Sequence, residues 1–196
     1  VLLEDFMSRV NKCVPALVAS ALVLSLGVLA PPSTGAVSAA VFEVSSGESI
    51  QDAIDAAAPG DTILVEPGTY TEDLLIDKSL TLISSDGSAT TTIAGLVDID
   101  LLDNEAMVFG EEGAGFTVTN PAGPGIDARL DYWSVLTVEG NTITGNASAG
   151  LRFYHVHYFS EAEVRGNQIS ENDEAGIEVG TFGEAVRYHS TVSILD

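Results

Sequence analysis

The chain has few basic residues. Its 196 residues include 7 lysines and arginines against 29 aspartates and glutamates, giving a formal net charge of −22. Nucleic acids and anionic membranes are bound through basic faces, so this shortage excludes a nucleic-acid partner and argues against docking on an anionic bilayer. The acidic residues are dispersed, which is typical of a protein kept soluble in concentrated salt, as in a halophile. An ordinary acidic extracellular protein is the alternative.

Cysteine, histidine and methionine are also scarce. Cys13 is the single cysteine, and the chain has three histidines and two methionines. One cysteine excludes an intrachain disulfide framework and a cysteine-based metal site. The short supply of nitrogen and sulfur ligands also argues against a copper or zinc centre.

The segment that precedes Ala40 is typical of an export signal. Met7 is the expected start, which leaves 1–6 as upstream residues that are not native to the protein. Two basic residues then precede an apolar run over 14–30, and Val37-Ser38-Ala39 fits a small-residue cleavage site. We therefore expect a signal peptide over 7–39, export to the extracellular space or cell surface, and no membrane insertion of the mature domain. Because the apolar run is long for a signal core, an uncleaved anchor is the alternative.

A repeat near the end of the chain indicates the fold. The segment 138–146 (VEGNTITGN) returns as 164–172 (VRGNQISEN), and each copy is followed by Ala-Gly and two alternating apolar residues. A weaker unit comes before them, because Val118 precedes Ile143 by almost the same interval. A fixed period in the range of about 20–50 residues is typical of repeat architectures. Helical repeats need good helix formers, whereas these units are rich in Gly, Asn, Thr and β-branched residues.

Each unit predicts short strands separated by turns. Apolar and polar residues alternate, as in a strand with one face buried, and the Gly-Asn pairs mark sharp turns. Stacked units would pair equivalent strands in parallel, about 4.8 Å apart, and would build a core that no single unit could form. We expect Ile143 to lie on Ile169, and Asn141 on Asn167 in an amide ladder. The prediction is an all-β parallel β-helix with three short strands per rung, over 40–196.

A short helix is expected before the first rungs. Ser49 fits an N-cap with Asp52 three positions later, and the following apolar residues share one stripe up to Ala57. Pro59-Gly60 ends the segment. A helix at this place would cap the first rung, whose unpaired strands are otherwise an aggregation edge.

The same region carries a family resemblance. The segments 49–57 (SIQDAIDAA), 59–63 (PGDTI) and 65–72 (VEPGTYTE) resemble the opening of right-handed parallel β-helix proteins of the pectate-lyase-like superfamily. With the Gly-Asn units, the chain is most similar to NosD-like exported and surface proteins that carry the carbohydrate-binding and sugar-hydrolysis repeat. The resemblance covers about 41–196 and implies a right-handed coil and an extracytoplasmic life. It does not imply one reaction, because this scaffold carries lyases, hydrolases, esterases and non-catalytic proteins.

The last residues, 192–196, read as the start of another rung with no cap behind them. The expectation is therefore that the domain is truncated at its carboxyl end and that any catalytic signature could lie in missing rungs.

Charged residues on the third strands are the first candidate site. Asp127, Arg152 and Glu178 each follow an inward apolar residue, so they should form one outward row, with Asp131 in the loop nearby. As catalytic residues they would serve as acid and base, with Arg152 as base or substrate clamp, in a polysaccharide lyase or glycosidase. The alternative is a surface salt-bridge ladder.

Aromatic residues of the loops after the third strands are the second candidate site. The expected ligand-binding residues are Tyr132, Trp133, Tyr154, His155, His157 and Tyr158. Aromatic faces with polar neighbours suit sugar rings, and packing over the strand edges is the alternative. His155 and His157 could share a metal, although no third ligand is visible.

The cofactor and partner expectations are limited. Calcium could bind the acidic strip Asp98, Asp100 and Asp103, and a solvated acidic edge is the alternative. Asn146-Ala147-Ser148 is a glycosylation sequon, but Asn146 is also a ladder position. The first hypothesis is a secreted or cell-surface protein that binds a polysaccharide or surface glycan without catalysis. The alternatives are the polysaccharide-cleaving enzyme and a purely structural or adhesive surface repeat.

Overall fold

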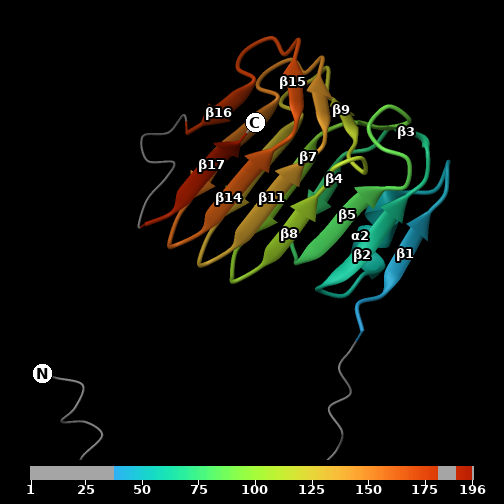
Figure 1. Ribbon diagram of the computed structural model, residues 1–196, viewed down its shortest axis with the longest axis horizontal. Helices are drawn as coiled ribbons and strands as arrows, with labels where there is room; N and C mark the ends of the chain where they lie inside the picture. Colours follow the sequence, from blue (N-terminus) through green and yellow to red (C-terminus); the bar gives the residue numbers. More distant parts are fainter. Residues whose placement is uncertain (1–37, 181–188, 196) are drawn as a thin grey trace, which may run out of the picture. The chain divides into compact units, whose positions relative to one another are not determined.

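The computed structural model describes residues 38–180 and 189–195. The predicted upstream residues 1–6, Cys13 and all of the predicted signal peptide except Ser38 and Ala39 lie outside the described residues. The described part of the chain forms the β-helix shown in Figure 1.

The strands form three parallel sheets, which run along the coil axis (Figure 1). Sheet A contains, in spatial order, β1 (Val41–Val44), β2 (Asp61–Val65), β5 (Leu80–Ser84), β8 (Ala106–Phe109), β11 (Val135–Glu139), β14 (Glu161–Arg165) and β17 (Thr191–Leu195). Sheet B contains β3 (Gly68–Tyr70), β6 (Thr91–Ala94), β9 (Thr117–Thr119), β12 (Thr142–Thr144) and β15 (Gln168–Ser170). Sheet C contains β4 (Leu74–Ile76), β7 (Val97–Leu101), β10 (Ile126–Leu130), β13 (Leu151–Val156) and β16 (Ile177–Val179).

The predicted stacking register is confirmed. The partners in adjacent rungs are Val138 with Val164, Ile143 with Ile169, Leu151 with Ile177, Phe153 with Val179, and Val118 with Ile143. All of the paired strands are parallel, so each rung supplies one strand to each sheet before the chain continues into the next rung. The architecture is the predicted all-β, right-handed parallel β-helix.

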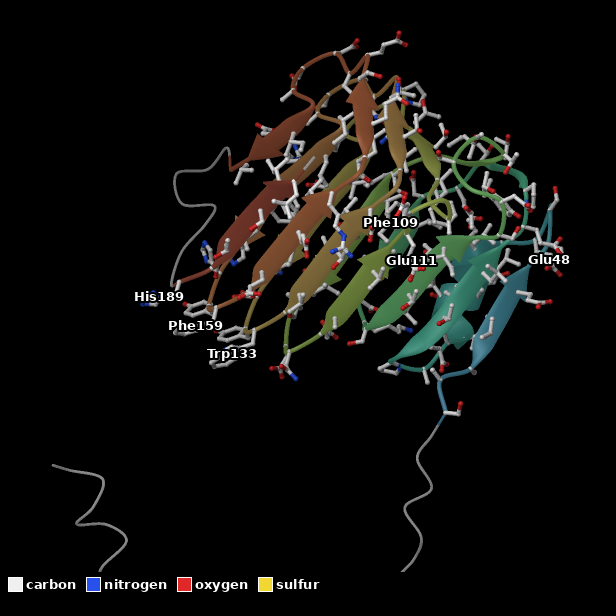
Figure 2. The ribbon with its side chains drawn as sticks, viewed as in Figure 1. Glu48, Phe109, Glu111, Trp133, Phe159 and His189 are labelled. Carbon is white, nitrogen blue, oxygen red and sulfur yellow. The ribbon has the colours of Figure 1, made fainter. Side chains whose placement is uncertain are left out.

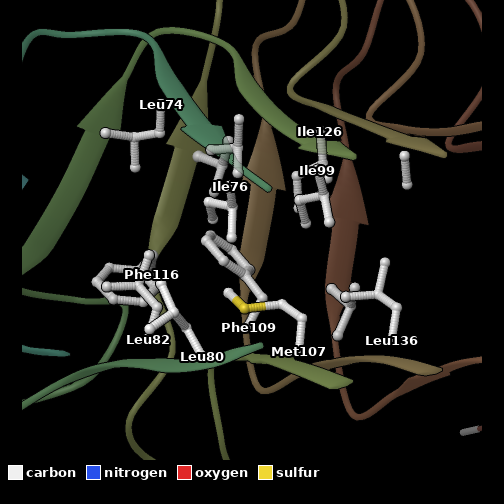
Figure 3. Packing of buried hydrophobic residues seen from close by; sticks show 14 of the residues in the cluster. Leu74, Ile76, Leu80, Leu82, Ile99, Met107, Phe109, Phe116, Ile126 and Leu136 are labelled. Carbon is white, nitrogen blue, oxygen red and sulfur yellow. The ribbon is translucent and has the colours of Figure 1, made fainter. Parts of the chain in front are cut away.

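The core follows from the alternation of inward and outward side chains along most of the strands. In β2, Asp61, Ile63 and Val65 are buried, while Thr62 and Leu64 face outward. Figure 3 shows the inward side chains of successive rungs packed together, with Phe109 beside Phe116 at a centroid separation of 5.3 Å. Burial of a side chain of this size contributes about 1.5–3 kcal/mol to the stability of the fold. Each rung buries the side chains of its neighbours, so this stability depends on stacking.

Asparagine ladders satisfy the buried turns, as predicted. The Asn141 amide nitrogen donates to Asn167 Oδ1 at 3.1 Å, and the Asn146 amide nitrogen donates to Asn172 Oδ1 at 2.7 Å. Asn141 and Asn146 are each 1% exposed, so their amides replace water as partners of the turn backbone.

Helix α2 (Ile50–Ala56) occupies the predicted capping position and packs against β1, β2 and β4. Ile50 and Ile54 are buried against the core, and Ser49 Oγ accepts a hydrogen bond from the Asp52 amide. The acidic residue of the helix cap differs from the prediction: Glu72, and not Asp52, supplies the carboxylate. Its carboxylate accepts from the Ile50 amide at 2.9 Å and from Ser49 Oγ at 2.8 Å, which ties the helix to the next rung.

Candidate functional site

The outer face of sheet C carries the predicted charged row. The strand register places Asp98, Asp127, Arg152 and Glu178 side by side on successive strands. Arg152 Nε donates to Asp127 Oδ1 at 2.9 Å, and its Nη2 donates to Asp127 Oδ2. This is a two-point guanidinium–carboxylate pair, the strongest geometry for such ions.

The electrostatics of the row favour the salt-bridge reading. The hydrogen bond from Arg152 to Asp127 raises the pKa of Arg152, so the guanidinium holds its proton more firmly than a free arginine does. A general base needs the opposite shift, which disfavours Arg152 in that role. Burial, followed by the nearby charges of Asp127 and Asp100, raises the pKa of Asp98.

A bulge shapes the second row of sheet C. Arg129 pairs with His155 and not with Tyr154, because the register between β10 and β13 shifts after Ala128. Strand β13 therefore continues through Tyr154 and His155, and both lie on the sheet and not in the loop where the sequence pattern placed them. Burial, then the charges of Asp100 and Asp98, raises the pKa of Tyr154 to about 12.

Asp131 belongs to this second row and to the turn beyond it. It is buried, its Oδ2 lies 3.2 Å from His155 Nε2, and Arg129 Nη2 lies 3.9 Å from the same oxygen. The His155 and His157 rings lie 3.6 Å apart between centroids. Burial, then the neighbouring His157, lowers the pKa of His155 despite the opposing charge of Asp131. The four proposed catalytic residues thus divide into the Asp127–Arg152–Glu178 row and a separate Asp131–His155 pair.

The metal expectations find no support in the donor geometry. Among the described residues, no group of three or more His, Cys, Asp or Glu side chains is placed to hold a metal ion. Asp100 already faces Arg129, whose Nη1 is 3.6 Å from its Oδ1. Calcium at Asp98, Asp100 and Asp103, and a metal at the two histidines, remain predictions from sequence.

The turns between sheets C and A carry stacked aromatic side chains. We call Tyr132, Trp133, Tyr158, Phe159 and His189 the aromatic turn column. Tyr132 stacks on Tyr158 with centroids 4.6 Å apart and planes 2° apart, and Trp133 stacks on Phe159 at 5.7 Å and 5°. Phe159 continues onto His189 at 5.5 Å. Figure 2 shows Trp133, Phe159 and His189 in line along one edge of the strands, pointing away from them.

The backbone beneath this column is strained. Tyr132 and Trp133 have φ of 47° and 63°, and Tyr158 and Phe159 have φ of 51° and 66°. A left-handed conformation costs an L-residue about 1–2 kcal/mol, and an aromatic pair returns about 0.5–1.5 kcal/mol. Elsewhere the same chain uses glycine for such turns, as at Gly140 with φ of 68°. Backbone geometry alone would favour glycine at these four positions, so the aromatic side chains must be there for another reason.

A serine ladder supports these turns and was not predicted. Ser134 and Ser160 are buried behind the aromatic residues; the Ser134 amide donates to Ser160 Oγ at 3.2 Å, and the Ser160 amide donates to Ser190 Oγ at 3.1 Å. The signal was present in the sequence, because a serine follows the second aromatic position in three consecutive turns.

The glycosylation sequon is inaccessible in the folded chain. Asn146 is 1% exposed, and its side-chain oxygen accepts from the Asn120 amide at 2.6 Å while its nitrogen donates to Asn172. A glycan on Asn146 would break the ladder, so the folding role of this residue outcompetes modification.

No family model matches the chain, and no solved structure matches it, so the resemblance to the pectate-lyase-like superfamily and NosD-like proteins stays a prediction. No helix in the described residues is long and apolar enough to cross a membrane. The chain is similar to a cell surface glycoprotein of Methanothermus fervidus, with 36% identity over 86 residues. The match covers 36% of this chain and 14% of that protein, so the chain spans a small part of this relative.

Proposed function

We propose that the protein is a secreted or cell-surface repeat protein that binds carbohydrate through its aromatic turn column, without catalysis. The exposure of strained aromatic residues carries this proposal. Trp133 is 56% exposed, and Tyr132 and Phe159 are 45% and 46% exposed. Exposure of apolar rings to water is unfavourable, so a cluster of exposed rings suggests a binding surface.

The geometry favours a ligand at Trp133. The backbone amide of Trp133 donates a hydrogen bond to the Tyr158 carbonyl in the next rung. The backbone amide of Asn104 donates in the same way to the Tyr132 carbonyl. Asn104 therefore holds the position equivalent to Trp133 one rung earlier. The ring stack therefore begins at Trp133. A sugar ring lying on Trp133 would extend a stack whose ring centroids are 5.7 Å and 5.5 Å apart. The acidic surface favours a neutral glycan over an anionic one.

Two further observations support a surface role. The relative is named as a cell surface glycoprotein, and a rigid coil of stacked rungs suits a protein that presents binding surfaces along its length. Arg152 is paired with Asp127 and its pKa is raised, so it is unsuited to act as a general base, which favours binding over cleavage by this residue.

The test uses the single tryptophan as a reporter. Neutral and acidic polysaccharides are titrated against the full chain while Trp133 fluorescence is followed, and a glycan array gives a second readout. We expect a neutral glycan to shift the emission. Affinity should fall at least about tenfold in Trp133→Ala, which corresponds to about 1.4 kcal/mol.

Leu75→Ala is the matched control on the array, because Leu75 is an apolar side chain of sheet C that is 48% exposed. It should leave affinity unchanged. If no glycan binds the full chain, the column is structural and the protein is a structural or adhesive repeat. Turnover of any polysaccharide that disappears in Arg152→Ala would instead establish the enzyme.

A further inference from the structure

The aromatic turn column ends beside two polar side chains. The strand register on both sides of the turn places Asn104 one rung before Trp133. The same register places Asp103 one rung before Tyr132. The backbone amide of Asn104 donates to the Tyr132 carbonyl at 2.8 Å, so the two turns are adjacent. We call Asp103 and Asn104 the polar ledge. Figure 2 shows Trp133 as the last ring of the line that continues through Phe159.

One face of the Trp133 indole is open. Phe159 stacks on the other face at 5.7 Å, and Trp133 still keeps 56% of its surface exposed. Asn104 has a short polar side chain, so it does not continue the stack of rings. Adjacent rungs are about 4.8 Å apart, and a ring that lay on the open face would therefore sit at the level of the polar ledge.

The side chains of the polar ledge are free to bind. Asp103 and Asn104 are exposed, and neither side chain makes a hydrogen bond or an ion pair with the residues 38–180 and 189–195 that the structure describes. The preceding rung turns earlier, through 77–79, and leaves the turn 102–105 uncovered. A carboxylate that accepts from two hydroxyls and an amide that both donates and accepts thus stand beside an open aromatic face.

We infer that Asp103 and Asn104 determine which sugar the aromatic turn column accepts, and that they select a neutral pyranose whose hydroxyl groups are equatorial. This inference rests on the proposed function, because it takes Trp133 as the ring on which the sugar lies. In binding sites that are mainly apolar, a few well-placed polar groups fix the orientation of the ligand and give specificity.

The stereochemistry follows from the placement of the ledge. A pyranose with equatorial hydroxyls presents C–H groups on its faces and hydroxyls around its edge. When one face lies on Trp133, the edge is directed at the Asp103 carboxylate and the Asn104 amide, which are at the same level. An axial hydroxyl projects from a face instead, so it either holds the sugar away from the indole or points away from the ledge. The charge of Asp103 also repels a uronate.

The experiment compares two neutral oligosaccharides on the full chain. Cellohexaose has only equatorial hydroxyls, whereas mannohexaose carries one axial hydroxyl on each ring. Both are titrated by calorimetry, with a chelator present so that calcium at Asp103 plays no part, and the fluorescence of Trp133 reports where they bind. We expect cellohexaose to bind at least about fivefold more tightly than mannohexaose, since the loss of one hydrogen bond changes affinity by about two- to tenfold.

Two variants test the ledge. Asp103→Ala and Asn104→Gly should each weaken cellohexaose binding by about three- to tenfold and leave mannohexaose binding almost unchanged, so the preference narrows. Asn104 has a φ of 54°, and asparagine is common in left-handed turns, so the turn alone could account for this residue. Glycine adopts the same backbone without an amide, and Asn104→Gly therefore separates binding from folding.

The matched controls lie on a turn between sheets B and C. Glu171→Gly places glycine at another exposed left-handed position, with φ of 55°, and Asp173→Ala removes another exposed carboxylate. Both controls should bind cellohexaose as the parent does, and circular dichroism should show all four variants folded.

The outcomes separate this inference from the proposed function. If no glycan binds the full chain, both are wrong. If cellohexaose binding is lost in Trp133→Ala but kept in Asp103→Ala and Asn104→Gly, the column binds sugar and only the role of the ledge is wrong. A parent that binds mannohexaose as tightly as cellohexaose, or that binds another glycan at Trp133 and not cellohexaose, would also overturn the inference alone.

Discussion

Replacing Asn141 tests whether the amide ladder holds the stack together. The side chain is 1% exposed; its Oδ1 accepts from the Phe116 amide at 2.9 Å, and its nitrogen donates to the Phe109 carbonyl at 3.0 Å and to Asn167 Oδ1 at 3.1 Å. Asn141→Ala removes these bonds and leaves the buried Phe116 N–H without its partner. An orphaned buried donor costs about 1–3 kcal/mol, and each further lost bond about 0.5–1.5 kcal/mol. We expect the free energy of unfolding to fall by about 2–6 kcal/mol.

The assay is urea denaturation followed by circular dichroism, with the free energy of unfolding obtained by linear extrapolation. Asn167 is half-buried in the next rung, so Asn167→Ala should cost less, about 1–2 kcal/mol. Thr144→Ala, at a half-buried outward position of β12, serves as control and should stay within about 0.5 kcal/mol of the parent. If Asn141→Ala and Thr144→Ala cost the same, the ladder is not a stabilising element and the reasoning fails.

Two other predictions concern backbone packing and pH. An added Cβ at Gly115 would overlap the carbonyl oxygen of Gly140, so Gly115→Ala should cost more than about 2 kcal/mol by urea denaturation, whereas Gly123→Ala, with its nearest contact at 3.6 Å, should be almost neutral. The pKa of His155 is lowered from 6.5 in the fold, so the unfolded chain binds the proton first and His155 removes stability as pH falls below about 6.5. The melting temperature measured between about pH 7 and pH 5 should therefore fall less in His155→Gln than in the parent, and a His189→Gln variant that flattened the curve equally would contradict this.

The stacking partners were predictable because the repeat is regular and local. Any two positions one period apart occupy the same place in adjacent rungs, so Ile143 over Ile169 and Asn141 over Asn167 follow from counting alone. The position of the capping helix was predictable, but the residue that caps its amino end was not. Glu72 is far from Ser49 in the sequence and reaches it only because the coil returns to the same corner, a contact that no local capping pattern contains.

The bulge at Tyr154 shows where the sequence pattern fell short. The interval from Asp131 to His157 is one position longer than the interval from Ile126 to Leu151, so an extra residue must be accommodated between them. The structure inserts Tyr154, which moves His155 onto Arg129 and toward Asp131. The change of period was visible, but its position within the strand depends on which side chain the neighbouring rung can accept.

For the aromatic residues and for the charged row, the sequence predicted which residues gather but not how they contact one another. The clustering of aromatic residues after the third strands was evident, but the left-handed backbone that stacks Trp133 on Phe159 and Tyr132 on Tyr158 is a property of the folded turns. The row of Asp127, Arg152 and Glu178 was predicted as a row, and the structure adds which pair is joined by two hydrogen bonds.

The parallel register also has a consequence for how such a chain can change length. Because strand pairing joins each of these rungs to the rungs directly above and below it, a duplicated stretch of one full period between β9 and β15 would insert as one more rung. Helix α2 would keep its own surroundings after such an insertion, because it packs against β1, β2 and β4. Extension by tandem duplication is thus open to this fold at a low structural cost, whereas the deletion of a single residue within a strand would exchange the inner and outer faces of the residues that follow it in that strand.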